Sequence, residues 1–584
     1  MTFLITEPES ISAVAANVEE IGSAIRAANA AAAGPTSSLL APAADEVSAA
    51  ITKLFGLYSQ EYQAVAGRGA AFHSQLAQAL NAAGSAYAAA EAAASNALGT
   101  AEADARAALG GAGAAGASAT ATPIASAATD PDVALVIGGN GNPVPNTTYT
   151  NGVLKWATRG GYTWNTVQPV FTPEGLYPLT GVKSLPLNAS VIQGLSILNE
   201  SIQGQIASGH SVLVQGYSQS AIIASLEMRQ LLASPNPPTS TQLYFNLLGD
   251  PMNPNGGLLE RFAGLNIPSL GVDFYGATPA NTPWTTNIFT LEYDGLADFP
   301  QYPIDVLSDL NAVAGIVYVH PLYPHLDPST VTLVQLPTSP GYTGHTTYYM
   351  GLTPNLPLLE PLRQVPVVGN PMADLLQPDL TYLVNWGYGN PLYGYSTGPA
   401  NVPTPFGLFP PLSATTALGP LMISGTQQGI VAAAGDFMTE GTSALSHPLL
   451  SPTGIWQSLS SISLSSPGTL LSRASIDGLL ESLASASTNI PNAISQAGAD
   501  VYAVLLPTAD ILNAAVTVIP AYDATLFVNG ITQAAGGDPM GLINAVGYPL
   551  AATTGLLTLA GGIEGLVVIG GALKATKAFT GLVS

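Results

Sequence analysis

The sequence predicts an α/β protein whose mostly parallel sheet is preceded by a helical hairpin and followed by a mainly helical region. Three observations indicate this fold class. Apolar residues recur at helical spacing in the first hundred residues, apolar strand runs then alternate with helical stretches, and Ala/Leu/Ser-rich stretches with many Gly and Pro breaks follow. We therefore expect a hairpin at 1–95, a flexible Ala/Gly linker at 96–131, an α/β domain at 132–400 and a C-terminal region of unassigned role at 401–584.

The composition excludes several classes of function. The net charge of −23 repels phosphate backbones, so nucleic acid is not expected as a partner. The chain has no cysteine, which excludes disulfides, thiol catalysis and cysteine-based zinc sites, and we expect neither a metal nor a cofactor. No basic region precedes Glu7, so a secretory signal peptide is not expected and export would use another route.

The first segment reads as two amphipathic helices. Apolar residues at spacings of three and four run from Ile11 to Ile25, and this helix ends before Gly34-Pro35. A longer stripe runs from Val47 to Leu80, with alanine at most intervening positions. Because two helices alone cannot bury both stripes, we expect the hairpin to need a partner.

Strands and helices alternate from residue 134 onward. The expected strands are 134–137, 212–214, 243–248 and 287–293, and the expected helices between them include 191–207 and 220–233. Ligands of such sheets bind at the carboxyl ends of the strands. Ser218, the Gly138 loop, Asp250 and Asp294 all fall at such ends.

The turn at Gly216-Tyr-Ser-Gln-Ser220 is the strongest chemical signal. A serine between a strand and a helix presents its hydroxyl above the sheet, so Ser218 is the candidate nucleophile. The backbone N–H of Gln219 would bind an oxyanion, together with N–H groups of Gly139 and Asn140 in the upstream glycine loop. That loop is not a dinucleotide fingerprint, because prolines follow it and the third glycine is missing.

A serine nucleophile needs a base and an acid, which follow it in the order Ser, Asp, His in one large class of hydrolases. Three of the six histidines are unsuitably placed along the chain: His73, His210 and His447. His320, His325 and His345 remain. Asp294 and Asp298 are the acid candidates, since Asp250 reads more readily as a turn residue.

Two segments carry a family resemblance. Pro8-Glu9 and Tyr87-x-x-x-Glu91, in an Ala-rich hairpin, resemble the mycobacterial PE domain. The segment from about 132 to 400 resembles the PE-PPE hydrolase domain. Its matching motifs are Gly-Tyr-Ser-Gln-Ser, Leu-Gly-Asp-Pro at 248–251, Tyr-Asp-Gly-Leu-Ala-Asp-Phe-Pro at 293–300 and Asn-Leu-Pro-Leu-Leu-Glu-Pro-Leu-Arg at 355–363.

The resemblance implies a cutinase-like serine esterase with an α/β-hydrolase fold. His320-Pro-Leu-Tyr is similar to the His-x-x-Tyr around the base of such enzymes, which favours His320 over His345. The cutinase pattern points to Asp294 as the acid, whereas the more general hydrolase pattern points to Asp298. It also implies export by a type VII secretion system with Tyr87 and Glu91 in the signal, a PPE protein as partner of the hairpin, and a location at the cell wall or cell surface.

We therefore expect a secreted serine esterase or lipase acting on short- to medium-chain acyl esters. An acyltransferase on envelope lipids and a non-catalytic envelope interaction protein stay open as alternatives. Residues 550–572 are apolar apart from Glu564 and several threonines. A central glutamate is costly in a membrane span, so we expect a buried or lipid-contacting helical hairpin there, with peripheral association with envelope lipid.

Overall fold

The computed structural model describes residues 130–365, 369–446 and 503–580, with side chains up to 433 and 571 in the last two ranges. It also describes isolated helical positions: Ala16, Glu19, Ser23, Arg26, Ala27, Ala30 and Ala499. The chain divides into two compact units, Met1–Ala119 and Thr120–Ser584, and of the first unit the structure describes only isolated helical positions. Nearly all of the predicted hairpin and linker, with Tyr87, Glu91, His73 and His447, lie outside the described residues.

A seven-stranded sheet forms the centre of the second unit, in the order β2-β1-β3-β4-β7-β9-β8. All neighbouring strands are parallel except β8, which pairs antiparallel with β9. The strands are β1 Val133–Ile137, β2 Thr166–Val170, β3 Val212–Tyr217, β4 Leu243–Leu248, β7 Thr285–Leu291, β8 Leu333–Gln335 and β9 Thr346–Gly351. A separate antiparallel pair joins β5 Asn266–Ile267 to β6 Val272–Asp273. The expected α/β class is therefore found.

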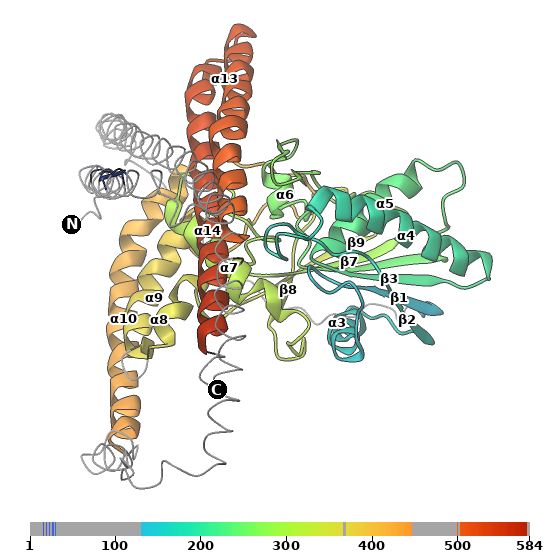
Figure 1. Cartoon of the computed structure of the whole chain (residues 1–584), viewed down its shortest axis with the longest axis horizontal. Helices are drawn as coiled ribbons and strands as arrows, with labels where there is room; N and C mark the ends of the chain where they lie inside the picture. The colour runs from blue at the N-terminus through green and yellow to red at the C-terminus, as the bar shows by residue number, and fades with distance from the viewer. Residues whose placement is uncertain are drawn as a thin grey trace, which may run out of the picture. The chain divides into compact units, whose positions relative to one another are not determined.

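Helices cover both faces of the sheet (Figure 1). The α4 helix Leu187–Ala207 and α5 helix Gln219–Leu232 pack on one face, where Leu135 and Val214 enter the core. The α3 helix Thr147–Arg159 packs on the other face, against Val136. Alternate residues of β1 thus enter opposite cores, and β1 is apolar along its whole length because both of its faces are buried.

The remaining elements surround the carboxyl edge of the sheet. They are α6 Leu258–Arg261, α7 Val306–Tyr318, η1 His320–Leu322, η2 Pro357–Leu359, α8 Glu360–Arg363, α9 Gly369–Trp386 and α10 Leu412–Ser446. The strand expected at 287–293 ends earlier, at Leu291. Tyr293 adopts φ +65°, so the chain has already turned before Asp294.

Two long antiparallel helices form the C-terminal hairpin. The first spans Ala503–Ala535 and contains the π-helical segment η3 Ala514–Val518 and α13 Ile519–Ala535, and the second is α14 Met540–Thr580. Both described helices are long and apolar enough to cross a membrane by length and composition. Glu564 is the charged residue that makes a membrane span of residues 550–572 unfavourable. It accepts a hydrogen bond from the Thr508 hydroxyl at 2.6 Å.

The hairpin contacts the elements around the carboxyl edge of the sheet. Gly562 of α14 packs against Val313 of α7, where a Cβ would lie 2.4 Å from the valine side chain. The Tyr177 hydroxyl donates to the Asp510 carboxylate at 2.6 Å, and Ser269 donates to the Asp510 carbonyl at 2.9 Å. The C-terminal region therefore belongs to the same compact unit as the sheet.

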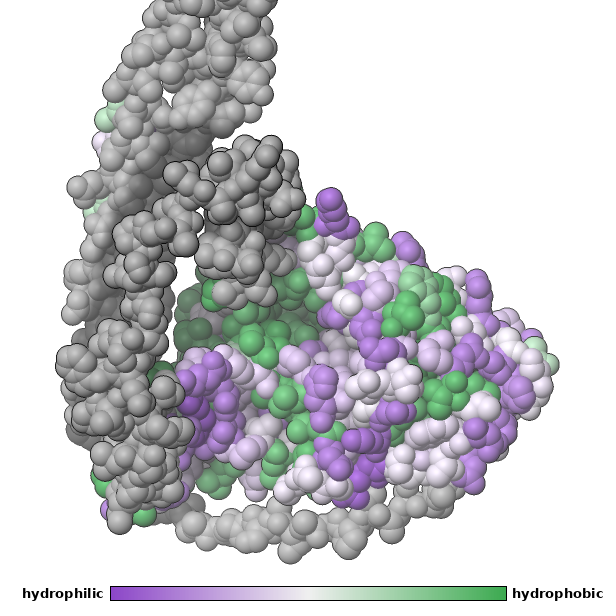
Figure 2. Space-filling view, turned by 60° about the horizontal axis from the view of Figure 1, so that its bottom comes forward, coloured by the Kyte–Doolittle hydropathy of each residue, from purple (hydrophilic) through white to green (hydrophobic). Residues whose placement is uncertain are grey.

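Apolar side chains reach the described surface in many places. Figure 2 shows green apolar, pale and purple polar side chains intermixed over one face. Several of the most exposed large apolar residues lie on the hairpin, including Leu542 and Val546 at 62% and 68% exposure. The sequence predicts a buried or lipid-contacting helical hairpin at residues 550–572, but this range is one continuous part of α14, and the hairpin is formed by α14 with the preceding helix.

Candidate active site

Ser218 occupies a strained corner between β3 and α5. Its backbone has φ +59° and ψ −121°, outside the usual range for a residue with a side chain. A Cβ on Gly216 would lie 2.9 Å from the Ser220 carbonyl oxygen, so this turn requires glycine there. The Ser220 hydroxyl donates to the Tyr217 carbonyl at 2.9 Å and accepts from the Tyr217 N–H at 2.8 Å. The two outer residues of the G-x-S-x-S motif thus hold the corner in shape.

Two backbone N–H groups near Ser218 are unused. The first N–H of α5, from Gln219, and the N–H of Asn140 have no hydrogen-bond acceptor among the described residues. Gly139 packs on the Tyr217 ring, which a Cβ would approach to 2.9 Å, and its N–H faces the Tyr149 hydroxyl. Of the two loop residues predicted as oxyanion donors, Asn140 is therefore the one whose N–H is free, because the N–H of Gly139 already faces a hydroxyl.

His320 connects the serine to an acid. Its Nε2 lies 2.8 Å from Ser218 Oγ, and its Nδ1 lies 2.8 and 2.9 Å from the two carboxylate oxygens of Asp294. His320 is the first residue of η1, directly beyond α7. The Tyr217 hydroxyl donates to the His320 carbonyl at 2.6 Å, and the Tyr217 ring stacks on the imidazole. Position and ring plane of the imidazole are thus both fixed.

Asp294 is buried and receives several hydrogen bonds. The Leu296 N–H and the Tyr323 hydroxyl donate to it at 3.0 and 2.9 Å, and the same hydroxyl accepts from the Leu291 N–H at 2.7 Å. These donors fix the orientation of the carboxylate toward the imidazole. Gly249, at φ +50°, lies so close that a Cβ would come within 3.1 Å of the Asp294 and His320 side chains.

The group is closed to solvent in this structure. Exposure is 2% for Ser218, 6% for His320 and 0% for Asp294. Low solvent content strengthens electrostatic interactions inside such a site. The arrangement can transfer a proton from the serine hydroxyl to the imidazole while the buried carboxylate stabilises the imidazolium.

Comparison with known proteins identifies the family of the chain. A PE-PPE domain model matches residues 164–389, and a PE family model matches residues 4–94. The chain is 45% identical over 451 residues to the PE family protein PE3 of Mycobacterium tuberculosis. The aligned region covers 74% of this chain and 88% of PE3. The chain belongs to the PE family. It carries a PE-PPE domain as well.

Two other relatives are a PPE family protein and a protein named as an esterase. The PPE family protein PPE28, named uncharacterized, is 49% identical over 446 residues, or 76% of this chain and 66% of PPE28. The protein named Esterase PE16 is 39% identical over 413 residues, or 70% of this chain and 73% of PE16. Both come from Mycobacterium tuberculosis. No solved structure matches the chain significantly.

The other predicted acids of the PE-PPE domain lie apart from the imidazole. Asp298 accepts a hydrogen bond from the Tyr293 N–H at 3.0 Å, and burial raises its pKa well above the usual range. Asp250 accepts from the Met252 N–H and the Thr278 hydroxyl, as expected of a turn aspartate, and burial raises its pKa to about 7. Neither is hydrogen-bonded to His320.

The alternative histidines are also separate from Ser218. His345 directly precedes β9, and its carbonyl accepts from the N–H of Thr286 near the start of β7. It therefore lies at the amino edge of these parallel strands, opposite the edge where Ser218 follows β3. His325 lies in the turn after η1, where its N–H donates to Leu322. No group of three or more potential metal ligands occurs among the described residues.

Two tyrosines of the PE-PPE domain support the site, although the sequence predicts no role for them. Tyr323 is the tyrosine of the His320-x-x-Tyr signature, and the structure gives it a role as donor to Asp294. Tyr217 lies inside the serine motif, where its ring and hydroxyl both hold His320. The spacing of both tyrosines was visible in the sequence, but their hydrogen bonds join residues that lie 103 positions apart for Tyr217 and 29 positions apart for Tyr323.

Proposed function

We propose that this PE-PPE domain is a serine hydrolase of the α/β-hydrolase type that cleaves acyl esters. The proposal rests on one observation: Asp294, His320 and Ser218 form a continuous hydrogen-bonded chain that ends at a serine on a strained strand-to-helix corner. The family match and the relative named Esterase PE16 support an ester-cleaving role. In this assignment the two unused N–H groups, of Gln219 and Asn140, receive the oxyanion.

The proposed reaction proceeds in two steps. His320 Nε2 takes the hydroxyl proton as Ser218 Oγ attacks the ester carbonyl carbon, and the carbonyl oxygen becomes an oxyanion. The tetrahedral intermediate collapses, and the imidazolium gives its proton to the departing alcohol, leaving an acyl-serine. Water then loses a proton to His320 as it attacks the acyl carbon, and Ser218 Oγ recovers a proton when the carboxylic acid leaves. Asp294 stays ionised and holds the Nδ1–H tautomer throughout.

The test is labelling with a fluorophosphonate probe followed by hydrolysis of nitrophenyl esters. We expect labelling of the wild type, none in Ser218→Ala, and rate losses of about 10³-fold or more in His320→Ala and Asp294→Asn. His345→Ala is the matched control and should keep its activity. Absence of labelling in folded wild-type protein would favour a non-catalytic envelope protein. Equal labelling of Ser218→Ala would refute the serine assignment.

The closed site gives one reason to keep acyl transfer as a second candidate. Exclusion of water favours a bound alcohol over water as the acceptor of the acyl group. Hydrolysis assays with an added glycerol or sugar acceptor distinguish the two. A transferase would yield mostly the new ester, whereas an esterase would yield mostly the free acid.

We also propose export through a type VII secretion system, in complex with a PPE protein, to the cell wall or cell surface, where the envelope supplies lipid esters. Tyr87 and Glu91 are the signal residues in this proposal. The test compares culture filtrate and cell-wall fractions of a mycobacterium that expresses the wild type or the Tyr87→Ala/Glu91→Ala variant. Secretion of the variant at the wild-type level would refute the proposed signal.

A further inference from the structure

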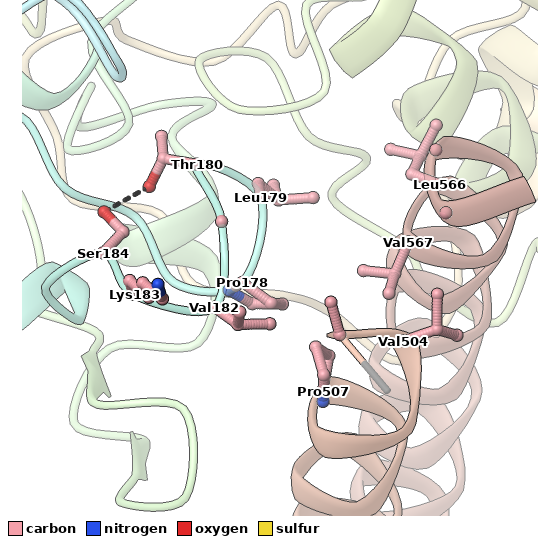
Figure 3. A pocket seen from close by; sticks show the side chains of 14 residues that line it. Pro178, Leu179, Thr180, Val182, Lys183, Ser184, Val504, Pro507, Leu566 and Val567 are labelled. Carbon is pink, nitrogen blue, oxygen red and sulfur yellow. Dashed lines mark hydrogen bonds between the residues drawn. The ribbon is translucent and has the colours of Figure 1, made fainter. Parts of the chain in front are cut away.

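A cavity of about 580 Å³ lies between the 178–184 loop, which connects β2 to α4, and the base of the C-terminal hairpin. Figure 3 shows Leu179 and Val182 on the loop side and Val567 of α14 on the opposite side. The first helix of the hairpin adds Val504 and Pro507. A volume of this size is in the usual range, about 300–1,000 Å³, of pockets that bind small organic ligands.

The side chains that line the cavity are mostly apolar. The hydroxyls of Thr180 and Ser184 bond to each other at 2.7 Å, and Thr180 also accepts from the Leu176 N–H at 2.8 Å, so these polar atoms already have partners. Lys183 is the one charged residue among the described lining residues, and it is exposed. Most other lining side chains are aliphatic, which suits a hydrocarbon chain.

Two hydrogen bonds hold the helical wall in place. Asp510 accepts from the Tyr177 hydroxyl at 2.6 Å, directly beside the 178–184 loop. Thr508 donates to Glu564 at 2.6 Å and so joins the two helices of the hairpin next to the cavity. The helices are therefore tied to the loop and to each other on the side where the cavity lies.

The cavity adjoins the loop that carries one predicted oxyanion donor. A Cβ on Gly141 would lie 3.6 Å from the Thr180 methyl group, and Gly141 directly follows Asn140. The Gly141 N–H donates to the Glu174 carbonyl at 2.8 Å, which joins the two loops. Ser218 itself is not among the lining residues. A ligand that occupies both places would hold its carbonyl at Ser218 and run an apolar tail past Thr180.

We propose that this cavity binds the acyl chain of the ester, and that the C-terminal hairpin thereby sets the chain length the enzyme prefers. This inference rests on the proposed ester hydrolysis at Ser218. It gives residues 503–571 a role as part of the substrate site. A chain that fills the cavity would raise kcat/KM by up to about fourfold for each buried methylene.

Variants that fill the cavity from opposite walls test the proposal. Val567→Trp and Leu179→Trp should lower kcat/KM for a nitrophenyl dodecanoate at least tenfold and leave nitrophenyl acetate unchanged. Val568→Trp is the matched control, because Val568 is the next residue of α14, is 45% exposed and does not line the cavity. A folding defect would lower the rates for both esters, so the ratio between them reports the cavity itself.

A binding experiment separates this inference from the proposed function. In the full chain with Ser218→Ala, fluorescent parinaric acid should bind, and the added Val567→Trp change should weaken its binding at least tenfold while Val568→Trp does not. This binding pattern, together with a folded wild type that hydrolyses no ester, would support the cavity and refute the esterase. Ester hydrolysis with the same chain-length profile in all three tryptophan variants would refute the cavity and leave the esterase intact.

Discussion

Glu174 offers a quantitative test of the electrostatics beside the candidate site. Its backbone has φ +49°, and its side chain is fully buried in the segment between β2 and α4. One carboxyl oxygen accepts from the Thr172 hydroxyl at 2.5 Å, and the other has no hydrogen-bond partner among the described residues. Burial raises the pKa of this carboxyl to about 8. The hydrogen bond from Thr172 acts in the opposite direction and lowers the pKa, but its effect is smaller.

The direction of the pH dependence follows from this pKa. Between pH 4.5 and about 8 the folded protein keeps a proton on Glu174 that the unfolded chain has released. Glu174 therefore destabilises the fold progressively as the pH rises through this window. At 1.36 kcal/mol per pH unit, the wild type should lose about 4 kcal/mol relative to Glu174→Gln between pH 5 and pH 8. Glutamine keeps an acceptor for the Thr172 hydroxyl and has no proton to lose.

The assay is urea unfolding of wild type and variant, followed by tryptophan fluorescence at pH 5, 6.5 and 8. The free energy of unfolding of Glu174→Gln should rise relative to that of the wild type at each increase in pH. The contributions of the other carboxyl groups cancel in this comparison because both proteins contain them. Glu200→Gln, on the exposed part of α4, is the control for removing a carboxyl that is not buried. A pH-independent difference for Glu174→Gln would refute the argument that Glu174 is protonated in the folded protein.

Three further predictions concern the hydrogen bonds around the candidate acid. Tyr323→Phe removes a donor to Asp294 and should lower kcat/KM for nitrophenyl esters about tenfold in a folded protein, so an unchanged rate would contradict that role. Gly249→Ala places a methyl group within 3.1 Å of His320 at a positive φ, so both the thermal midpoint and the rate of probe labelling should fall. Asp298→Asn should keep probe labelling within a few-fold of wild type. Loss of labelling in Asp298→Asn, with labelling retained in Asp294→Asn, would reverse the choice of acid.

The buried strands could be predicted from sequence, but the edges of the sheet could not. β1 is a continuous apolar run, and β3 and β4 are mostly apolar apart from Gln215 and Asn246, because both faces of the sheet are covered. The edge strand β2 reads Thr-Val-Gln-Pro-Val and is mostly exposed, so its sequence carries no comparable signal. α3 was also missed, since threonines, Asn151 and Gly152 interrupt the apolar stripe that its Trp156 completes.

The sequence could predict candidates for the catalytic residues, but it could not choose between the alternative acids. The serine motif predicts a corner because its small residues suit a tight strand-to-helix turn, and the structure has that corner at Ser218. Asp294 and Asp298 follow the same strand within a few residues, so spacing could not separate them. Their difference arises at Tyr293, whose positive φ turns the chain and whose N–H binds Asp298 while Asp294 contacts His320. The catalytic roles stay predictions until the variants are assayed.

The strand order also shows that the segment matched by the PE-PPE domain model is smaller than the unit that must fold together. The PE-PPE match begins at residue 164 and ends at 389, which excludes β1, Asn140 and the hairpin. Yet β1 lies between β2 and β3 and pairs with both. A fragment cut at those limits would therefore lack an internal strand of the sheet. A fragment for expression should therefore start before Val133 and extend beyond Gly562, where α14 still contacts α7.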